Sequence, residues 1–445
     1  MVEALSESER FPLLTAEGRR LLHWLHENEF APRYNHHCGD RLTTEGLRRV
    51  IDFENELHTA SNGWQSGTQP AWLADFAAMC FDDVPFYRRY GAMPADFSLI
   101  PTCERADLSR EPWLFVPDSQ SLDDLIVYCT SGTTGQPLDV LSHPNVSSMY
   151  LPLLRFIVGT RGVKLEGSAG RVAVALVCFQ KSTITYASIS TFLNQAGLIK
   201  INLNPNDWRD LNDRARFLDE CNPEIYTGDP ISFAELMTLP LRTRPKALVS
   251  TAMMLTAGLR EKLETHFSCP VIDLYSMNES GPIAVANDEG HAVLPHCIYV
   301  EILRDDGTVC APGERGEITL TGGFNPFLPL LRYRTGDHAA MQFRGRLPML
   351  VGLEGRAPVV FRSTSGRRIN NIDISTMLKP FALTQFALHQ FIDGSLRLRV
   401  RGALGNPAQL RDVLIALFGA QQRLVIESVD SFGDKVMQYT SDYAE

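Results

Sequence analysis

Six small residues between two apolar runs have the composition of a loop that binds phosphate. They are Thr130, Ser131, Gly132, Thr133, Thr134 and Gly135. The apolar run Leu125–Tyr128 before them predicts a buried strand, and Leu138–Leu141 after them predicts a second strand. Glycine allows the backbone to turn through positive φ close to a ligand, and successive N–H groups with four nearby hydroxyls can then surround an anion. An ordinary polar turn is the competing interpretation. A Walker A loop is excluded, because no Gly-Lys-Ser/Thr follows at the required spacing.

The string T-S-G-T-T-G-x-P at residues 130–137 resembles the phosphate loop of the adenylate-forming enzymes, the superfamily of acyl- and aryl-CoA ligases, luciferases and carrier-protein adenylation domains. Two further segments follow in the order typical of this superfamily. Ile272–Glu279 resembles its Y-x-x-T-E segment, and Leu330–Asp337 matches its R-Y-R-T-G-D segment. The resemblance covers roughly residues 85–439, and the wording of the third segment is most similar to the phenylacetate-CoA-ligase branch. One departure is Gln136, because many relatives have lysine there.

The resemblance implies that these segments bind ATP with Mg²⁺. The second segment contains Tyr275, Ser276, Met277, Asn278 and Glu279. Its tyrosine ring can stack on adenine, the Asn278 amide can donate to the α-phosphate, and the Glu279 carboxylate can ligate Mg²⁺. The resemblance gives Asp337 the two ribose hydroxyls as hydrogen-bond donors, which a carboxylate can accept together. A surface glutamate after a core tyrosine, and a turn capped by an aspartate, are the competing interpretations.

Three other segments complete the expected nucleotide site. Ser250–Met254 takes the place of the adenine-binding loop of the relatives but lacks its glutamate, so backbone groups of Ala252 and Met253 are expected to contact the adenine. Leu353–Arg356 matches the start of the hinge of the relatives, where the arginine, here Arg356, reaches the nucleotide. The hinge then departs from the family, because Ala357-Pro358-Val359 replaces acidic residues and proline stiffens the joint.

Lys435 lies in Gly433–Val436, which resembles the G-K segment of the superfamily. In the relatives this lysine bridges the substrate carboxylate and the nucleotide, and a charge on a flexible stem can follow the transition state. A solvated lysine near the chain end is the alternative. The resemblance thus assigns catalytic roles to Lys435, Glu279 and Thr130.

The pattern of apolar residues predicts a multi-layer α/β fold with two domains. Residues 1–353 form the expected N-terminal adenylation core, with a helical lead-in to about residue 118 that contains the helices Thr15–Glu29 and Thr44–His58. Helices are also expected at Asn145–Val158 and Asp207–Cys221, and a central strand at Val172–Phe179. Residues 354–445 form the expected small α+β domain, because Leu396–Arg401 alternates with period two and Leu410–Leu417 has a helical face. The resemblance implies that this domain is mobile.

The composition is that of a globular protein of ordinary polarity. The chain has 445 residues, 44% of them hydrophobic and 21% charged, with a formal net charge of -10 and nine scattered cysteines. Scattered Lys and Arg argue against nucleic acid or an anionic membrane as partner. No signal peptide and no apolar run of membrane-spanning length is recognised, so we expect a cytoplasmic protein with reduced thiols. A zinc site is not expected near His291, His296 and Cys297, since a cysteine pair is missing. The oligomeric state stays open, with a homodimer among the alternatives.

The predicted function is ATP-dependent activation of a small, aromatic carboxylic acid as an acyl-adenylate, with release of pyrophosphate. Transfer of the acyl group to a thiol, by analogy that of CoA, would follow. Two alternatives stay open. The acceptor could be a carrier protein, an amine or a hydroxyl group in a biosynthetic pathway, to which the altered hinge points. The chain could also be a nucleotide-binding protein without ligase activity, to which Gln136 and the missing adenine-loop glutamate point.

Overall fold

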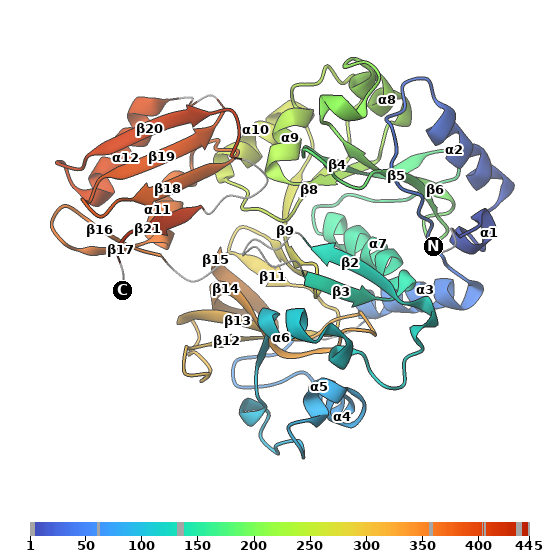
Figure 1. Cartoon of the computed structure of the whole chain (residues 1–445), viewed down its shortest axis with the longest axis horizontal. Coiled ribbons are helices and arrows are strands. Elements are labelled where there is room, and N and C mark those ends of the chain that lie inside the picture. Colours follow the sequence, from blue (N-terminus) through green and yellow to red (C-terminus); the bar gives the residue numbers. More distant parts are fainter. Residues whose placement is uncertain are drawn as a thin grey trace.

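The computed structural model describes residues 5–59, 63–130, 138–355, 359–402, 404, 406–432 and 438–443. Figure 1 shows a large unit on the right, coloured blue to orange, and a smaller red unit on the left that contains the last strands and helices. The large unit ends with a strand at Glu354, and the small unit begins with a strand at Val360. The division of the chain between residues 353 and 354 stays a prediction about independently folding domains.

One 13-stranded mixed sheet runs through the large unit in the order β12-β13-β14-β15-β11-β10-β9-β8-β7-β4-β6-β5, with β1 paired to β14. The strands from β6 to β9 pair in parallel, whereas β9 to β15 pair antiparallel. β9 therefore joins the two halves of the sheet. The strands are β1 (Cys103–Glu104), β4 (Val172–Cys178), β5 (Tyr186–Ser190), β6 (Ala196–Asn202), β7 (Ile225–Gly228), β8 (Ala247–Ser250), β9 (Val271–Met277), β10 (Gly281–Ala286), β11 (His291–Val293), β12 (Ile298–Leu303), β13 (Arg315–Gly322), β14 (Leu330–Arg344) and β15 (Leu347–Glu354).

Helices cover both faces of the parallel half of the sheet. One face packs against α2 (Ala16–Glu27), α8 (Asp213–Cys221), α9 (Pro230–Leu236) and α10 (Ala257–Phe267), and the other packs against α3 (Thr44–Thr59) and α7 (Pro144–Gly159). In α2, Thr15 caps the first turn, and Leu21, Leu22 and Leu25 form one buried face. This layered arrangement confirms the predicted α/β class, and the helices expected at Thr15–Glu29, Thr44–His58 and Asn145–Val158 are present within two residues at each end.

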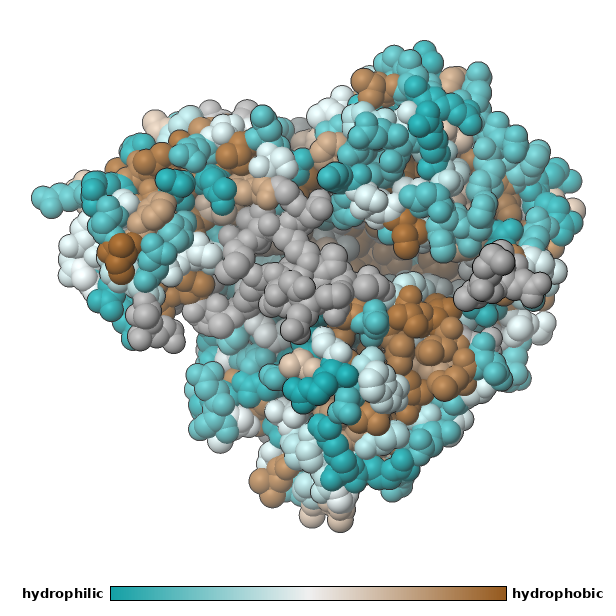
Figure 2. Space-filling model, viewed as in Figure 1, coloured by the Kyte–Doolittle hydropathy of each residue, from teal (hydrophilic) through white to brown (hydrophobic). Residues whose placement is uncertain are grey.

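A separate hairpin carries the two ends of the expected phosphate loop. Its strands are β2 (Ile126–Thr130) and β3 (Leu138–Ser142), paired antiparallel. The prediction that the first strand is buried is wrong, because Val127 and Tyr128 are 52% and 46% exposed. Figure 2 shows apolar side chains gathered in the region of this hairpin, along the rim of a hollow. β2 pairs only with β3 among the described strands, so this two-stranded hairpin lies outside the large sheet.

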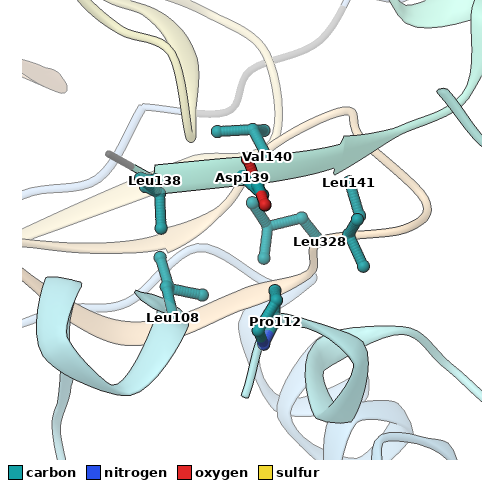
Figure 3. A pocket seen from close by; sticks show the side chains of 7 residues that line it. All are labelled: Leu108, Pro112, Leu138, Asp139, Val140, Leu141 and Leu328. Atoms are coloured by element: carbon teal, nitrogen blue, oxygen red, sulfur yellow. The ribbon is translucent and has the colours of Figure 1, made fainter. Parts of the chain in front are cut away.

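The second strand of the hairpin packs on a short helix, α6 (Arg105–Arg110). Figure 3 shows the apolar crevice between them, in which Leu108 of α6 faces Leu138, with Leu328 nearby. Leu138 and Val140 belong to the same core cluster as Tyr333 of β14. The remaining short elements of the large unit are α1 (Glu7–Arg10), α4 (Leu73–Asp83), α5 (Pro85–Arg88), η1 (Phe97–Leu99), η2 (Pro112–Phe115), η3 (Leu122–Asp124) and η4 (Pro205–Asp207).

The small unit has its own sheet and core. Its four-stranded sheet has the order β20-β19-β18-β21, and the apolar residues of β19 pack under α11 and α12 while Arg397 and Arg399 are exposed. The period-two pattern therefore predicted the strand and its faces correctly. The elements are β16 (Val360–Arg362), β17 (Arg368–Asn370), α11 (Asn371–Leu378), β18 (Phe386–Gln390), β19 (Leu396–Arg401), α12 (Pro407–Phe418), β20 (Leu424–Val429) and β21 (Tyr439–Ser441).

The two units touch where α10 begins. The Thr256 hydroxyl donates to the carbonyl of Leu383 at 3.2 Å, and the N–H of Gly258 donates to the carbonyl of Lys379 at 3.2 Å. Elsewhere the Arg401 guanidinium lies 5.4 Å from the ring centre of Phe179. Within the described ranges, no helix is both long enough and apolar enough to cross a membrane.

Candidate functional site

A hydrogen bond joins the second and third predicted segments. The hydroxyl of Tyr275 donates to Oδ2 of Asp337 at 2.8 Å. Tyr275 lies on β9 and Asp337 on β14, and three strands separate these two in the sheet. Burial and the Asp337 carboxylate raise the pKa of Tyr275 well above its usual value, so the hydroxyl keeps its proton and stays a donor. The tyrosine thus fixes the carboxylate that was predicted to bind ribose.

The turn before Asp337 is stabilised by the residues that immediately precede it and by Glu317. Gly336 has φ +79°, which the glycine allows without strain. The N–H of Gly336 donates to Oε1 of Glu317 at 2.9 Å, and the N–H of Asp337 donates to the hydroxyl of Thr335 at 3.0 Å. Arg334 pairs with the same Glu317 at 2.6 Å. The string R-T-G-D therefore makes a bulge in β14 that presents the Asp337 side chain.

Glu279 is a buried carboxylate in the turn between β9 and β10, with 5% of the residue exposed. Its Oε1 accepts from Nη1 of Arg105 at 2.8 Å and from the hydroxyl of Tyr333 at 3.1 Å. Tyr333 and Asp337 both lie on β14, so this strand holds the two predicted carboxylates of the site in one region. Burial raises the pKa of Tyr333 well above its usual range, and the Glu279 charge adds to the effect.

The end of β8 lies beside Ser276. The hydroxyls of Thr251 and Ser276 are 2.6 Å apart, and the N–H of Thr251 donates to the carbonyl of Gly228 at 2.9 Å. Ala252 follows with φ +68°, a left-handed conformation that costs a residue with a Cβ on the order of 1 kcal/mol. Ala252 is exposed and Met253 is half-buried. The structure thus brings the segment predicted to contact adenine next to the Tyr275 segment.

The rest of the second segment divides between core and solvent. Met277 is half-buried and packs between two core clusters, with its sulfur 3.9 Å from the hydroxyl of Tyr275. Asn278 is exposed at the turn. The exposed amide of Asn278 is available to a ligand, whereas the Met277 side chain packs against Tyr275.

Arg332, in the third segment, serves the scaffold. Arg332 is only 2% exposed and forms a two-nitrogen ion pair with the buried Glu301, at 3.1 and 3.3 Å. It also donates to the backbone carbonyls of Ser98 and Ile100. The hydroxyl of Tyr87 accepts from the N–H of Leu331 at 2.9 Å just before it. These contacts fix the start of β14, and they keep Arg332 away from any ligand.

The hinge begins beside Asp337. A Cβ at Gly355 would lie 3.4 Å from Oδ1 of Asp337, and the preceding Glu354 is buried with Arg315 at 3.4 Å. Burial raises the pKa of Glu354, while a hydrogen bond from Ser375 of the small unit opposes that shift. The strand that leads to the hinge therefore passes the site and then contacts the small unit.

Several predicted residues lie outside the described residues: Ser131, Gly132, Thr133, Thr134, Gly135, Arg356 and Lys435. Of Thr130, the structure describes the backbone, which pairs with Leu138 at the end of the hairpin. The charges of Tyr128 and Glu279 both add to the effect of burial in raising the pKa of Tyr150 on α7. The hairpin, α7 and Glu279 are therefore close neighbours.

Arg105 and Tyr333 contribute to the site although neither was predicted from the sequence. Arg105 is 174 residues before its partner Glu279, and nothing in its local sequence marks it as a charge partner. Tyr333 lies inside the third segment, so the motif already marked its neighbourhood. The alternation of side chains along a strand does not tell which face of a bent strand is directed at the site.

Comparison with known proteins gives a family and a fold. A family model described as AMP-binding enzyme matches residues 95–325, just over half of the chain. Protein CapK of Staphylococcus aureus is 22% identical over 321 residues, which are 68% of each protein. Phenylacetate-coenzyme A ligase of Escherichia coli strain K12 is 32% identical over 88 residues, 18% of this chain and 20% of that protein. A crystal structure of 2-hydroxyisobutyryl-CoA ligase in the postadenylation state has a TM-score of 0.62 and 16% identity, covering 89% of this chain and 90% of that one.

Proposed function

Because the chain belongs to the AMP-binding enzyme family of the adenylate-forming superfamily, we propose that it activates a carboxylic acid with ATP as an acyl-adenylate and releases pyrophosphate. The observation that carries this proposal is the joining of the second and third segments around β14. Tyr275 donates a hydrogen bond to Asp337 of β14, and Tyr333, also on β14, donates one to Glu279. The hairpin that ends in the T-S-G-T-T-G string packs beside them.

The proposed reaction overcomes the low reactivity of a free carboxylate. Its negative charge repels nucleophiles, and an oxide is a poor leaving group. One carboxylate oxygen attacks the α-phosphorus of ATP in line, the bond to the β-phosphate oxygen breaks, and pyrophosphate leaves with the electron pair. Catalysis of this kind depends on positioning and on electrostatic stabilisation.

The residues divide these tasks. Asp337, held by Tyr275, accepts the ribose hydroxyls, and the backbone of Ala252 and Met253 with Ser276 borders the adenine. Asn278 donates to the α-phosphate, and the loop Thr130–Gly135 holds the β- and γ-phosphates. Lys435, on the segment before β21, stabilises the charge that develops at the α-phosphate, and Arg356 contacts the nucleotide from the hinge. These roles are carried over from the superfamily onto matching positions.

Magnesium fits this site as an ion that arrives with the nucleotide. No group of three or more His, Cys, Asp or Glu residues among the described residues could hold a metal ion by itself. The described contacts of Glu279 all use Oε1, so Oε2 is the oxygen that would ligate the ion. Mg²⁺ commonly binds through one carboxylate together with substrate phosphates and water. When bound, it would neutralise charge on the phosphates.

An aromatic acid matches the side chains beyond Glu279. Burial raises the pKa of Tyr150 and of Tyr186, and the charge of the Tyr128 phenol adds to both shifts, which puts Tyr128 near each of the other two rings. Phe324 contacts the Tyr150 ring edge-on at 5.4 Å. Aromatic rings gathered in this way would favour an aromatic guest, whose flat faces pack against them.

CoA is the proposed acceptor of the acyl group. Two of the proteins similar to this chain are named as CoA ligases, and one of them acts on phenylacetate. This is why we place the chain near the phenylacetate-CoA-ligase branch. A carrier protein, an amine or a hydroxyl group would need the same first step, so the acceptor is decided by experiment.

Pyrophosphate release tests the proposal. The purified protein, with Mg²⁺ and ATP, is given benzoate, phenylacetate, other aromatic acids and a matched series of aliphatic acids. We expect acid-dependent release with at least one aromatic acid, and a thioester of that acid by mass spectrometry when CoA is added. Release without a thioester would move the assignment to another acceptor. No acid-dependent release, together with intact ATP binding, would indicate a nucleotide-binding protein without ligase activity.

A further inference from the structure

The carboxylate proposed to ligate Mg²⁺ already has a positive partner. Nη1 of Arg105, the first residue of α6, lies 2.8 Å from Oε1 of Glu279. The side chain of Glu279 is 4% exposed, whereas that of Arg105 is 32% exposed. A carboxylate this deeply buried needs a counter-charge, because removing one partner of a buried ion pair leaves a charge that water cannot reach.

The Arg105 contact differs from the fixed ion pair nearby. Arg332 and Glu301 are each 3% exposed, are joined through two nitrogens, and are tied to two backbone carbonyls. The described contact of Arg105 with Glu279 uses one nitrogen and one oxygen, and a third of the arginine side chain is in solvent. Tyr333 would keep its bond to Oε1 if the guanidinium moved. Because a third of its side chain already lies in solvent, the Arg105 guanidinium can exchange its contact with Glu279 for water.

We propose that Arg105 and a divalent cation alternate as the counter-charge of Glu279, an inference that rests on the proposed role of Glu279 in binding Mg²⁺ with ATP. Without nucleotide, Arg105 neutralises and positions the carboxylate. When the metal–nucleotide complex binds, the ion would ligate Oε2 of Glu279, and its charge would repel the guanidinium on Oε1, which then withdraws toward solvent. Arg105 is thus a positioning residue that competes with the metal and sets the metal concentration at which the site fills.

Competition has a direct consequence for metal affinity. Removing the arginine charge removes the competitor and leaves Glu279 uncompensated until a metal arrives. Arg105→Gln should therefore bind Mn²⁺ together with α,β-methylene-ATP about tenfold more tightly than the wild type, which is the usual scale of one partly buried charge pair. The metal-free variant should melt at a lower temperature, and the rise in melting temperature caused by Mn²⁺ with the analogue should be larger than in the wild type.

Mn²⁺ titrations followed by electron paramagnetic resonance, with α,β-methylene-ATP and without acid, measure the free ion and avoid turnover. Arg110→Gln is the matched control, because Arg110 is an exposed arginine on the same helix. It should behave like the wild type. Equal or weaker Mn²⁺ binding by Arg105→Gln, while the wild type binds the metal with the analogue, overturns the inference alone.

Two further results separate the inference from its premise. Analogue binding by the wild type that does not depend on Mn²⁺ would contradict the metal role of Glu279 itself. If Arg105→Gln folds poorly, the double variant Arg105→Gln/Glu279→Gln removes the uncompensated charge and should regain the melting temperature of the wild type without the tighter Mn²⁺ binding. A double variant no more stable than Arg105→Gln would overturn the counter-charge account.

Discussion

Asp337 is the residue whose surroundings are best defined by the structure. A hydrogen bond of 2.8 Å from Tyr275 fixes one carboxylate oxygen, and the Gly336 turn directs the side chain out of β14. Such a carboxylate is prepared for a donor pair such as the two hydroxyls of ribose. Its neighbour Glu317 has a different task, because it holds the turn through Arg334 and the Gly336 N–H.

Asp337→Ala should weaken ATP binding by roughly 1.5–3 kcal/mol, since hydrogen bonds to a charged group contribute about that much. Tyr275→Phe should weaken it less, because the ring stays and the carboxylate is only less firmly held. Isothermal titration with ATP measures both variants. Glu289→Ala, an exposed carboxylate of the same half of the sheet, is the control. Unchanged affinity in Asp337→Ala would mean that the ribose lies elsewhere.

His296 makes the stability of the fold depend on pH, and it has no predicted role in the candidate site. Its ring is buried between Phe53 and Phe324, and neither ring nitrogen has a partner among the described residues. Burial lowers the pKa of His296 from 6.5 to about 3. Between pH 6.5 and about 3, the imidazole of His296 therefore binds a proton in the unfolded chain but not in the folded chain. The free energy of unfolding consequently falls as the pH is lowered through this range.

The expected loss is about 1.4 kcal/mol per pH unit between pH 6.5 and 3. His296→Leu should remove this contribution, so that the free energy of unfolding drops about 1 kcal/mol less than in the wild type between pH 6.5 and 5.5, where half of the unfolded chains are already protonated at the upper limit. Urea denaturation at the two pH values measures the difference. His23→Leu, at an exposed position of α2, should keep the slope of the wild type. Parallel slopes in the wild type and His296→Leu would contradict the buried, neutral imidazole.

At the scale of elements, β14 organises the site. Over 15 residues it contacts Tyr87 at its start, carries Tyr333 to Glu279, and bulges to present Asp337. Its position depends on the ion pair of Arg332 with Glu301, in which both side chains are 3% exposed. Breaking this pair would disturb the strand before it disturbs any ligand contact.

Arg332→Met should destabilise the large unit by about 3–5 kcal/mol, because Glu301 would be left buried without a counter-charge. Adding Glu301→Leu should restore much of the loss, since two apolar side chains can fill the space. Arg304→Met is the comparison, because the Arg304–Glu314 pair is 41% and 38% exposed, and water and salt screen the attraction between its charges. Thermal melts of the four proteins test this. A loss in Arg332→Met no larger than in Arg304→Met would refute the structural role.

The sequence predicted the regular elements well where local pattern decides them. α2 and α3 each begin with a threonine cap and have one apolar face, and β19 alternates leucine or valine with arginine. The helix expected from Asp207 begins instead at Asp213, because Asn204 caps a short 3₁₀ turn that ends at Asp207. The exposure of Val127 and Tyr128 on β2 could not be foreseen either, since it depends on what packs against the hairpin.

The site was predictable in part for the same reason. Motifs identified Tyr275, Glu279 and Asp337, and the structure places these side chains around two neighbouring hydrogen bonds. The pairing of Arg105 with Glu279 spans 174 residues and follows from the packing of α6 between the hairpin and β14. No local rule encodes such a contact. The roles of residues 131–135, Arg356 and Lys435 stay predictions.

At the scale of the whole molecule, the small unit docks on the first turn of α10. A Cβ at Gly258 would lie 2.5 Å from backbone atoms of Pro380 and Phe381, so only glycine permits this contact. The N–H of Gly258 and the hydroxyl of Thr256 bond to the same loop of the small unit. The observed arrangement of the two units therefore depends on one missing side chain.

Gly258→Ala should separate the units, although alanine in a helix normally stabilises by up to about 1 kcal/mol. We expect a larger radius of gyration by small-angle X-ray scattering and faster proteolysis between the units. Gly159→Ala is the control, because a Cβ there meets nothing within 4 Å. An unchanged radius of gyration in Gly258→Ala would show that the contact does not hold the units together.

Lys435 belongs to the small unit, so its proposed role requires that this unit close on the nucleotide. Lys435→Ala should lower acid-dependent pyrophosphate release by at least about a hundredfold, since one preorganised charge at a transition state contributes on that scale. ATP affinity should change little. Lys379→Ala, on an exposed position of the same unit, is the control. Undiminished release in Lys435→Ala would remove this residue from the mechanism.

Detection of the acyl-adenylate itself tests the account most directly. The protein is mixed with ATP, Mg²⁺ and the acid that gives the fastest pyrophosphate release, without CoA, quenched in acid and analysed by mass spectrometry. We predict one equivalent of the acid–AMP ester per active site in the wild type, and less than a tenth of that in Asp337→Ala and Glu279→Gln. No ester with any acid of the panel, or the same yield in both variants, would contradict the proposal that β9, β14 and the hairpin enclose one ATP.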